Sequence, residues 1–278
     1  MGLQLLTGGT LFAMFEQSSG VSQLNNLEYK NLFEEETMNF RGLFRVAAVC
    51  AIGYAAVSLA SYIATLSASG FLIASSKLPS AEQLYASLQL KGNHISLRLD
   101  LLSYFLLIPS LVGIYAYLRE RRPGRAHLGA AFAAFALFVF FVQTALYSAA
   151  LTLAEGPLTD SLKERLAAMS LLAFSFMIPA LWSAAVSNLL WGLALRTQTG
   201  LARMAGNFFL AQVLGFLIAG AGFNTGQDVV GNIGILINTV ALAASYASAG
   251  ALLREASKED AQAKTSVQGQ PRAASASA

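Results

Sequence analysis

The sequence predicts an all-α polytopic integral membrane protein, a bundle of six transmembrane helices, and three observations carry that prediction. Hydrophobic residues make up 55% of the 278 residues, whereas charged residues make up only 12%, about half the share of an ordinary soluble domain. Six separate stretches each hold the roughly 20 mainly apolar residues that a spanning helix requires. None of the six carries an acidic or basic residue in its central third.

The predicted spans follow one another with short links. They are residues 44–66, 97–118, 128–154, 166–195, 204–223 and 229–253. Since a backbone in hydrocarbon must satisfy its own polar groups, each span is expected to be a helix. The link from 67 to 96 is the longest, and within it Pro79 and Ser80 predict a short surface helix over 80–88 that Ser80 would cap.

The distribution of Lys and Arg predicts the orientation of the bundle. The link 119–125 reads RERRPGR, and positive charge collects on the cytoplasmic side of membrane proteins. Placing this link inside puts both termini inside, with 13 of the 18 Lys and Arg residues on the cytoplasmic side. The expected location is a bacterial cytoplasmic membrane, with the lipid bilayer as the partner.

Three regions are expected along the chain. Residues 1–43 form an N-terminal cytoplasmic or interfacial segment, in which the apolar residues at 1–6 and 11–15 favour an interfacial helix over a disordered tail. Residues 44–253 form the transmembrane domain. Residues 254–278, rich in Ser, Ala, Lys and Gln, are expected to be a disordered cytoplasmic tail.

Several short motifs at the span ends carry a family resemblance. The second span is entered through ISLRLDLL at 95–102 and ends in YAYLR at 115–119, and the fourth ends in LLWGLALR at 189–196. Arg203, Ala205 and Gly206 then lead into the fifth span. This layout resembles the DUF4386 family of uncharacterised bacterial six-helix membrane proteins over roughly residues 44–253. The chain departs from that family in two ways. It lacks the Pro often found just before the Arg of the link between the fourth and fifth spans, and it has an extra N-terminal segment. The resemblance implies the six-helix fold and supplies no reaction, cofactor or ligand.

Three ionisable residues at the outer end of the second span form a candidate outer vestibule, namely His94, Arg98 and Asp100. Ionisable residues at the membrane are hypotheses of a functional site. His94 and Arg98 are four residues apart and share a helix face, whereas Arg98 and Asp100 are two apart and do not pair. The alternative is structural: a helix dipole that favours Asp100 and a snorkelling Arg98. Neighbouring outer ends offer Glu155, Asn224 and Asp228 as further members.

Polar and helix-breaking residues inside the spans give a second set of candidates. Pro109 and Pro179 are expected to kink the second and fourth spans at similar depth. Transporters bind substrates at broken helices, although ordinary kinks are the alternative. The amides either line a path or hydrogen-bond between helices. They are Gln143, Asn188, Asn207, Gln212, Asn232 and Asn238.

Small residues at four-residue spacing favour packing of the fifth span against the sixth within one chain over dimerisation. The fifth span presents Ala211, Gly215 and Ala219, and small residues allow two backbones to approach closely. The sixth span presents a matching series, Ala241, Ser245 and Ala249.

The residue inventory excludes several classes of function. One cysteine, Cys50, permits no disulfide within the chain and no thiolate-based zinc site. No run of four to eight Lys and Arg residues lies along a helix, so nucleic acid is not an expected partner. The sequence holds no phosphate-binding loop, no GxSxG, no HExxH and no central pair of carboxylates. No catalytic residue, metal or cofactor is therefore assigned.

Three hypotheses of function remain. The leading one is a non-enzymatic membrane protein that binds a small or lipidic ligand or serves as an accessory to an assembly. The alternative is a small-solute transporter or channel that uses the two Pro-containing spans. The third is an intramembrane enzyme with a site at the outer face. The sequence does not decide between a monomer and a homo- or hetero-oligomer.

Overall fold

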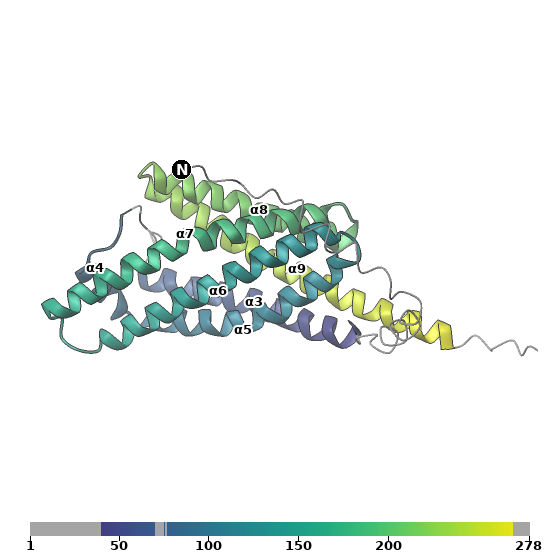
Figure 1. The fold of residues 1–278 in the computed structure, drawn as a ribbon, viewed down its shortest axis with the longest axis horizontal. Coiled ribbons are helices and arrows are strands. Elements are labelled where there is room, and N and C mark those ends of the chain that lie inside the picture. Colours follow the sequence, from purple (N-terminus) through teal and green to yellow (C-terminus); the bar gives the residue numbers. More distant parts are fainter. Residues whose placement is uncertain (1–39, 70–74, 76, 269–278) are drawn as a thin grey trace, which may run out of the picture. The chain divides into compact units, whose positions relative to one another are not determined.

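The fold is that of a computed structural model, which describes residues 40–69, 75 and 77–268 (Figure 1). Within these ranges the chain forms seven helices and no strand, and six of the helices are long and apolar enough to cross a membrane. The six are α3 (Phe40–Ser69), α5 (Lys91–Arg119), α6 (Pro123–Leu153), α7 (Asp160–Arg196), α8 (Gly200–Asn224) and α9 (Asp228–Gln268). The predicted all-α, six-helix membrane bundle is confirmed, and the chain is a multi-pass membrane protein.

The helices begin and end at residues suited to those positions. Pro123 occupies the first turn of α6, where its missing N–H costs nothing. Thr159 caps α7, with its Oγ1 accepting a hydrogen bond from the Leu162 N–H at 3.3 Å. Gly200, the first residue of α8, and Gly226, in the turn after α8, have positive φ angles of +61° and +71°, a backbone conformation that other residues rarely adopt.

Helices adjacent in sequence pack against each other from α5 through α9, and α5 also contacts α9. The helix α3 lies against α5 and α9, and two glycines mark the places of closest approach. A Cβ on Gly113 of α5 would collide with Ala47 of α3, and a Cβ on Gly250 of α9 would lie 2.9 Å from the Ala48 carbonyl oxygen. Small residues therefore set the separation between these helices.

The pair α8 and α9 packs most closely, as the small residues of the two spans predicted. A Cβ on Gly215 would lie 2.6 Å from the backbone N of Asn238, and one on Gly234 would collide with Ala219. The predicted face of α8 is thus confirmed at Gly215 and Ala219. On α9 the closest approach falls at Gly234 and Asn238, nearer the start of the helix than the predicted series.

The predicted surface helix is also confirmed. It is α4 (Ala81–Leu88), and it begins with a capping box in which Ser80 and Gln83 satisfy each other's backbone N–H groups. Leu84 and Leu88 of α4 form a buried cluster with residues from the ends of α6 and α7, beside which α4 lies in Figure 1. We call this the α4 end of the bundle; the links 120–122 and 197–199 lie at its opposite end.

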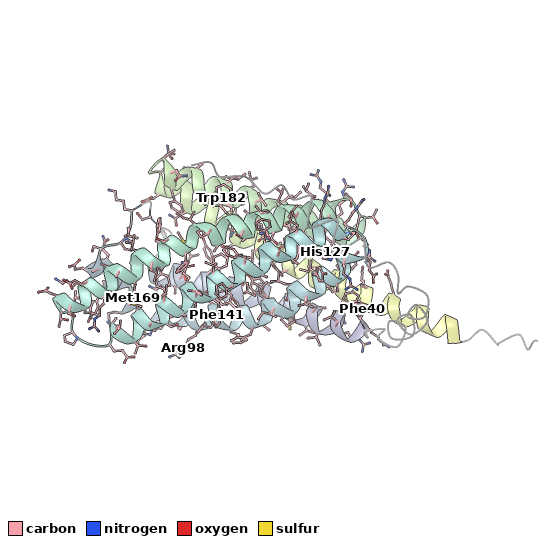
Figure 2. All side chains as sticks on the ribbon, viewed as in Figure 1. Phe40, Arg98, His127, Phe141, Met169 and Trp182 are labelled. Carbon is pink, nitrogen blue, oxygen red and sulfur yellow. The ribbon has the colours of Figure 1, made fainter. Side chains whose placement is uncertain are left out.

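Large apolar side chains are exposed on the outer surface of the spanning helices, as a bilayer requires. Figure 2 shows Phe141 and Trp182 among them. Others are Val49, Ile63, Phe105, Phe138, Leu171, Leu214, Leu217, Ile233 and Val240.

One terminal prediction is corrected by the structure. The segment 254–268 continues α9 as a helix, where the sequence predicted disorder. This stretch contains no Gly or Pro and is rich in Ala, Glu and Lys, so intrinsic helix propensity sustains the last span beyond its apolar part. Residues 1–39 of the predicted interfacial segment lie outside the described residues, and so do residues 269–278 of the predicted tail.

Candidate functional site

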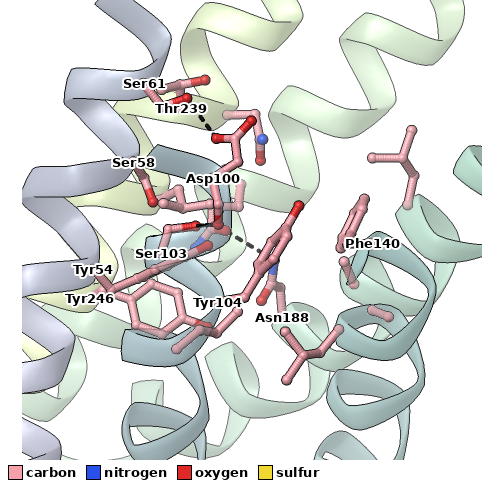
Figure 3. Close-up of a pocket in the computed structure, with 18 of the residues that line it drawn as sticks. Tyr54, Ser58, Ser61, Asp100, Ser103, Tyr104, Phe140, Asn188, Thr239 and Tyr246 are labelled. Atoms are coloured by element: carbon pink, nitrogen blue, oxygen red, sulfur yellow. Dashed lines mark hydrogen bonds between the residues drawn. The ribbon is translucent and has the colours of Figure 1, made fainter. Parts of the chain in front are cut away.

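All six spanning helices border one central cavity of about 350 Å³ (Figure 3). Its lining is divided along the bundle axis. Hydroxyl groups and one carboxylate from α3 and α5 gather in the part nearer the α4 end. The deeper part combines apolar side chains, such as Leu107 and Leu111 of α5, with the polar residues Ser187, Asn188 and Gln212. Further apolar members of the lining are Phe140, Leu181, Phe216 and Leu242.

Asp100 is the one charged residue that lines the cavity in the described part of the chain. It lies nine residues into α5, about 13 Å along the helix axis from Lys91. Ser61 of α3 donates a hydrogen bond to its Oδ1 at 2.6 Å, which Figure 3 shows as a dashed line. No other described residue bonds the carboxylate, so Oδ2 is left available.

A chain of hydroxyl groups from α3 and α5 leads to this carboxylate. Thr65 Oγ1 lies 2.8 Å from Ser96 Oγ, and Ser96 Oγ lies 2.9 Å from Ser61 Oγ. Each hydroxyl has a single proton, and Ser61 gives its own to Asp100. Ser96 must therefore donate to Ser61 and Thr65 to Ser96, so that all three O–H groups point toward the carboxylate. Such aligned chains polarise each other and strengthen the final bond.

Tyrosine rings border the cavity below the carboxylate. Tyr54, Tyr104 and Tyr246 lie on the side of Asp100 away from Ser61 in Figure 3. The Tyr54 and Tyr246 rings meet edge to face with centroids 4.6 Å apart. Beyond Tyr246 the contact continues through Phe209 to Trp191, at 5.5 and 6.4 Å. These four rings, from α3, α9, α8 and α7, form a buried aromatic row, of which Tyr54 and Tyr246 line the cavity.

Two buried amides of the lining tie three helices together. Asn188 of α7 donates to Gln212 of α8 at 3.1 Å, and Gln212 donates to Ser245 of α9 at 2.7 Å. Asn238 of α9 also borders the cavity, and its buried Oδ1 accepts no hydrogen bond from any described residue. Two hydrogen bonds therefore link α7, α8 and α9 beside the cavity, and Asn238 Oδ1 is a buried acceptor without a partner among the described residues.

The seam between α5 and α6 separates the cavity from a groove on the outer surface. Tyr104 OH of α5 lies 3.0 Å from Thr144 Oγ1 of α6. Tyr104 and Leu137 line both the cavity and the groove, whose other lining residues, such as Phe105 and Phe138, are apolar. Two side chains therefore stand between the cavity and the lipid-facing side of this seam.

The structure does not bring the three vestibule candidates together. His94 turns to α4, where its Nε2 donates to the Leu88 carbonyl at 2.6 Å. Arg98 is exposed at the periphery (Figure 2) and forms no ion pair with a described residue. Asp100 alone faces the cavity. Glu155 and Asn224 are exposed, and Asp228 accepts a bond from Ser75, so none of these joins Asp100.

The amide and proline candidates divide between the cavity and its surroundings. Asn188, Gln212 and Asn238 line the cavity, whereas Asn207 is exposed and Asn232 donates to the Asp228 carbonyl at 2.8 Å. Gln143 is half-buried and outside the lining. The two prolines, Pro109 and Pro179, lie within α5 and α7 beside lining residues Leu107, Leu111 and Leu181.

The hydroxyl residues of the site were missed by the sequence reasoning, although a signal existed. Tyr54, Ser58, Ser61 and Thr65 are spaced by three and four residues along α3, and all four line the cavity. Ser96, Asp100 and Ser103 follow the same spacing on α5. Such spacing places polar groups on one face of an otherwise apolar helix, and that face turns toward the bundle interior.

The site contains no arrangement typical of a metal centre. Among the described residues, no group of three or more His, Cys, Asp or Glu side chains is placed to hold a metal ion. The lining instead offers one carboxylate, several hydroxyls and aromatic faces, a set suited to non-covalent binding.

No protein-family model, no curated protein and no solved structure matches the chain, so the resemblance to the DUF4386 family remains a prediction.

Proposed function

We propose that this protein binds a small ligand inside its six-helix bundle, in the central cavity, with Asp100 as the polar anchor. The observation that carries the proposal is a lone carboxylate that faces a cavity of about 350 Å³ and keeps one oxygen free. Burying a charged group within a membrane domain is costly, and such groups are retained where they serve a function. A volume of this size falls at the lower end of the range for small-molecule sites, about 300–1,000 Å³.

Filling the cavity tests the proposal. Ala184 of α7 lines the cavity, and Ala184→Leu would place three additional carbon atoms in it. Ala168→Leu makes the same change at an exposed position of the same helix and is the matched control. Binding is measured on the full chain in detergent with two probes of similar shape, 2-phenylethylammonium and 2-phenylethanol, by equilibrium dialysis and by thermal stabilisation.

The expected result is that at least one probe binds the unmodified chain and the Ala168→Leu variant, and that Ala184→Leu loses this binding. Failure of both probes to bind at millimolar concentration would contradict the proposal. Equal binding by the two variants would also contradict it, because the probe would then occupy some other place.

Transport of the ligand is the second candidate function, and the position of the prolines favours it. Pro109 and Pro179 each remove one backbone hydrogen bond from a helix that borders the cavity. A missing bond makes a helix easier to bend, and transporters place broken helices around the substrate site. Uptake of the bound probe into liposomes that contain the protein is expected to fall in Pro109→Ala while binding is retained. Uptake equal to that of protein-free liposomes would leave binding as the function.

A further inference from the structure

The chemical imbalance of the cavity lining indicates which kind of ligand it takes. The lining contains no Lys, Arg or His, and its one charge is the carboxylate of Asp100. Asp100 Oδ2 has no partner among the described residues, and the buried Asn238 Oδ1 has none either. The hydroxyl groups of the lining can donate or accept hydrogen bonds, but none of them carries a charge. The negative charge of Asp100 and its free oxygen are therefore what a ligand must complement, with a positive charge and a donor.

We propose that the ligand is a small organic ammonium ion that carries an apolar group. An ammonium centre supplies up to three donors, no acceptor and one positive charge, and so matches the free, negatively charged oxygen of Asp100. Its hydrogen bond to Oδ2 would complement the bond that Ser61 already makes to Oδ1. The assignment rests on the proposed binding function and adds the class of ligand to it.

The aromatic part of the lining supports a cationic head group. Tyr54, Tyr104 and Tyr246 border the space next to the carboxylate, and the faces of aromatic rings attract organic cations. A bare sodium ion would gain little from these rings and would leave most of the 350 Å³ unfilled. A dianionic ligand would be repelled by the carboxylate, and a neutral sugar-like ligand would leave its charge uncompensated.

The deeper part of the lining accounts for the apolar group. Leu107 lies seven residues beyond Asp100 on α5, about 10 Å further along the helix axis. With Leu111, Phe140 and Leu181 it presents hydrocarbon to the cavity. A ligand of this class would place its ammonium group at Asp100 and its apolar group between these side chains.

The comparison of 2-phenylethylammonium with 2-phenylethanol tests the charge requirement, because the two probes differ mainly in the ammonium group. The unmodified chain is expected to bind the ammonium probe at least about tenfold more tightly. Asp100→Asn is expected to abolish that preference. Binding of the alcohol by this variant, together with an unaltered circular dichroism spectrum, shows that the variant is folded. Glu155→Gln, which neutralises an exposed carboxylate near the same end, is the matched control and is expected to retain the preference.

Three outcomes would overturn the assignment. The first is equal affinity of the unmodified chain for the two probes, a result that does not depend on whether Asp100→Asn folds. The second is an Asp100→Asn variant that retains the preference. The third is displacement of the ammonium probe by millimolar sodium chloride but not by equimolar N-methylglucamine chloride, which would identify a sodium site. Binding of the alcohol alone would overturn the ligand class and leave the binding function standing, whereas binding of neither probe would contradict both.

Discussion

Replacing Gly215 by alanine is expected to force α8 and α9 apart next to the cavity. The new Cβ would lie 2.6 Å from the backbone N of Asn238 and 2.8 Å from its Cα. Ordinary contacts between such atoms lie near 3.5 Å, so α9 would have to retreat by roughly 1 Å. Both atoms belong to helical backbone, and no side-chain rotation can relieve the collision. Overpacking of this kind costs about 1–3 kcal/mol.

Gly220→Ala on the same helix separates this cost from the effect of alanine on helix formation. A Cβ on Gly220 would meet nothing within 4 Å. Both variants gain the same helix propensity, about 1 kcal/mol, so the difference between their free energies of unfolding isolates the collision. Gly215→Ala is expected to be less stable than Gly220→Ala by about 1–3 kcal/mol.

Unfolding by increasing amounts of denaturing detergent, followed by circular dichroism, measures this difference. The displaced α9 carries Asn238 and Thr239 of the cavity lining, so Gly215→Ala should also bind its probe more weakly than Gly220→Ala. Equal stability of the two variants, together with equal binding, would refute the close approach of α8 and α9 and the shape of the cavity that follows from it.

Three further results are expected. Ser61→Ala removes the donor to Asp100 and should lower the free energy of unfolding by about 1.5–3 kcal/mol. Ser103→Ala loses only a hydrogen bond within its own helix and should lower the free energy of unfolding by less. Equal losses in the two variants would argue against the hydroxyl chain. Gln212→Leu removes two hydrogen bonds between helices and should lower the free energy of unfolding by about 1–3 kcal/mol in the same assay. Asn207→Leu, at an exposed position of the same helix, should leave the stability nearly unchanged. A Gln212→Leu variant of unchanged stability would contradict the amide network. With Cys50→Ala as background, a membrane-impermeant maleimide should label Lys77→Cys in intact cells and Arg122→Cys only after lysis, and the reverse pattern would overturn the predicted orientation.

Hydropathy predicted the six spans because the requirement for a long apolar helix is local and depends on each stretch alone. The ends of the helices were less predictable. Capping at Ser80 was visible in the sequence, whereas the continuation of α9 past Arg254 was not. A polar segment made of good helix formers can either extend the helix before it or be disordered. Composition therefore gave the wrong structure for 254–268.

The site was predictable only in part, because spacing along one helix does not say which other helix meets it. The sequence singled out Asp100 by its position near the membrane, and excluded Arg98 as its partner by their spacing. It could not show that Ser61 of α3 supplies the hydrogen bond, since the pairing of α3 with α5 depends on close contacts such as Gly113 with Ala47. Nor could it separate Gln212, inside the bundle, from Asn207 on its surface.

The aromatic row gives the protein an optical property of its own. The chain has two tryptophans, Trp182 and Trp191, which are nine residues apart on α7 and therefore lie on opposite faces of the helix. Trp182 is 61% exposed on the lipid-facing side, whereas Trp191 is 1% exposed at the end of the row. Lipids with brominated acyl chains would quench the first fluorophore and spare the second. The emission that survives then comes from an indole joined by ring contacts to Tyr246 at the cavity wall, so the unlabelled protein carries its own reporter of events inside the bundle.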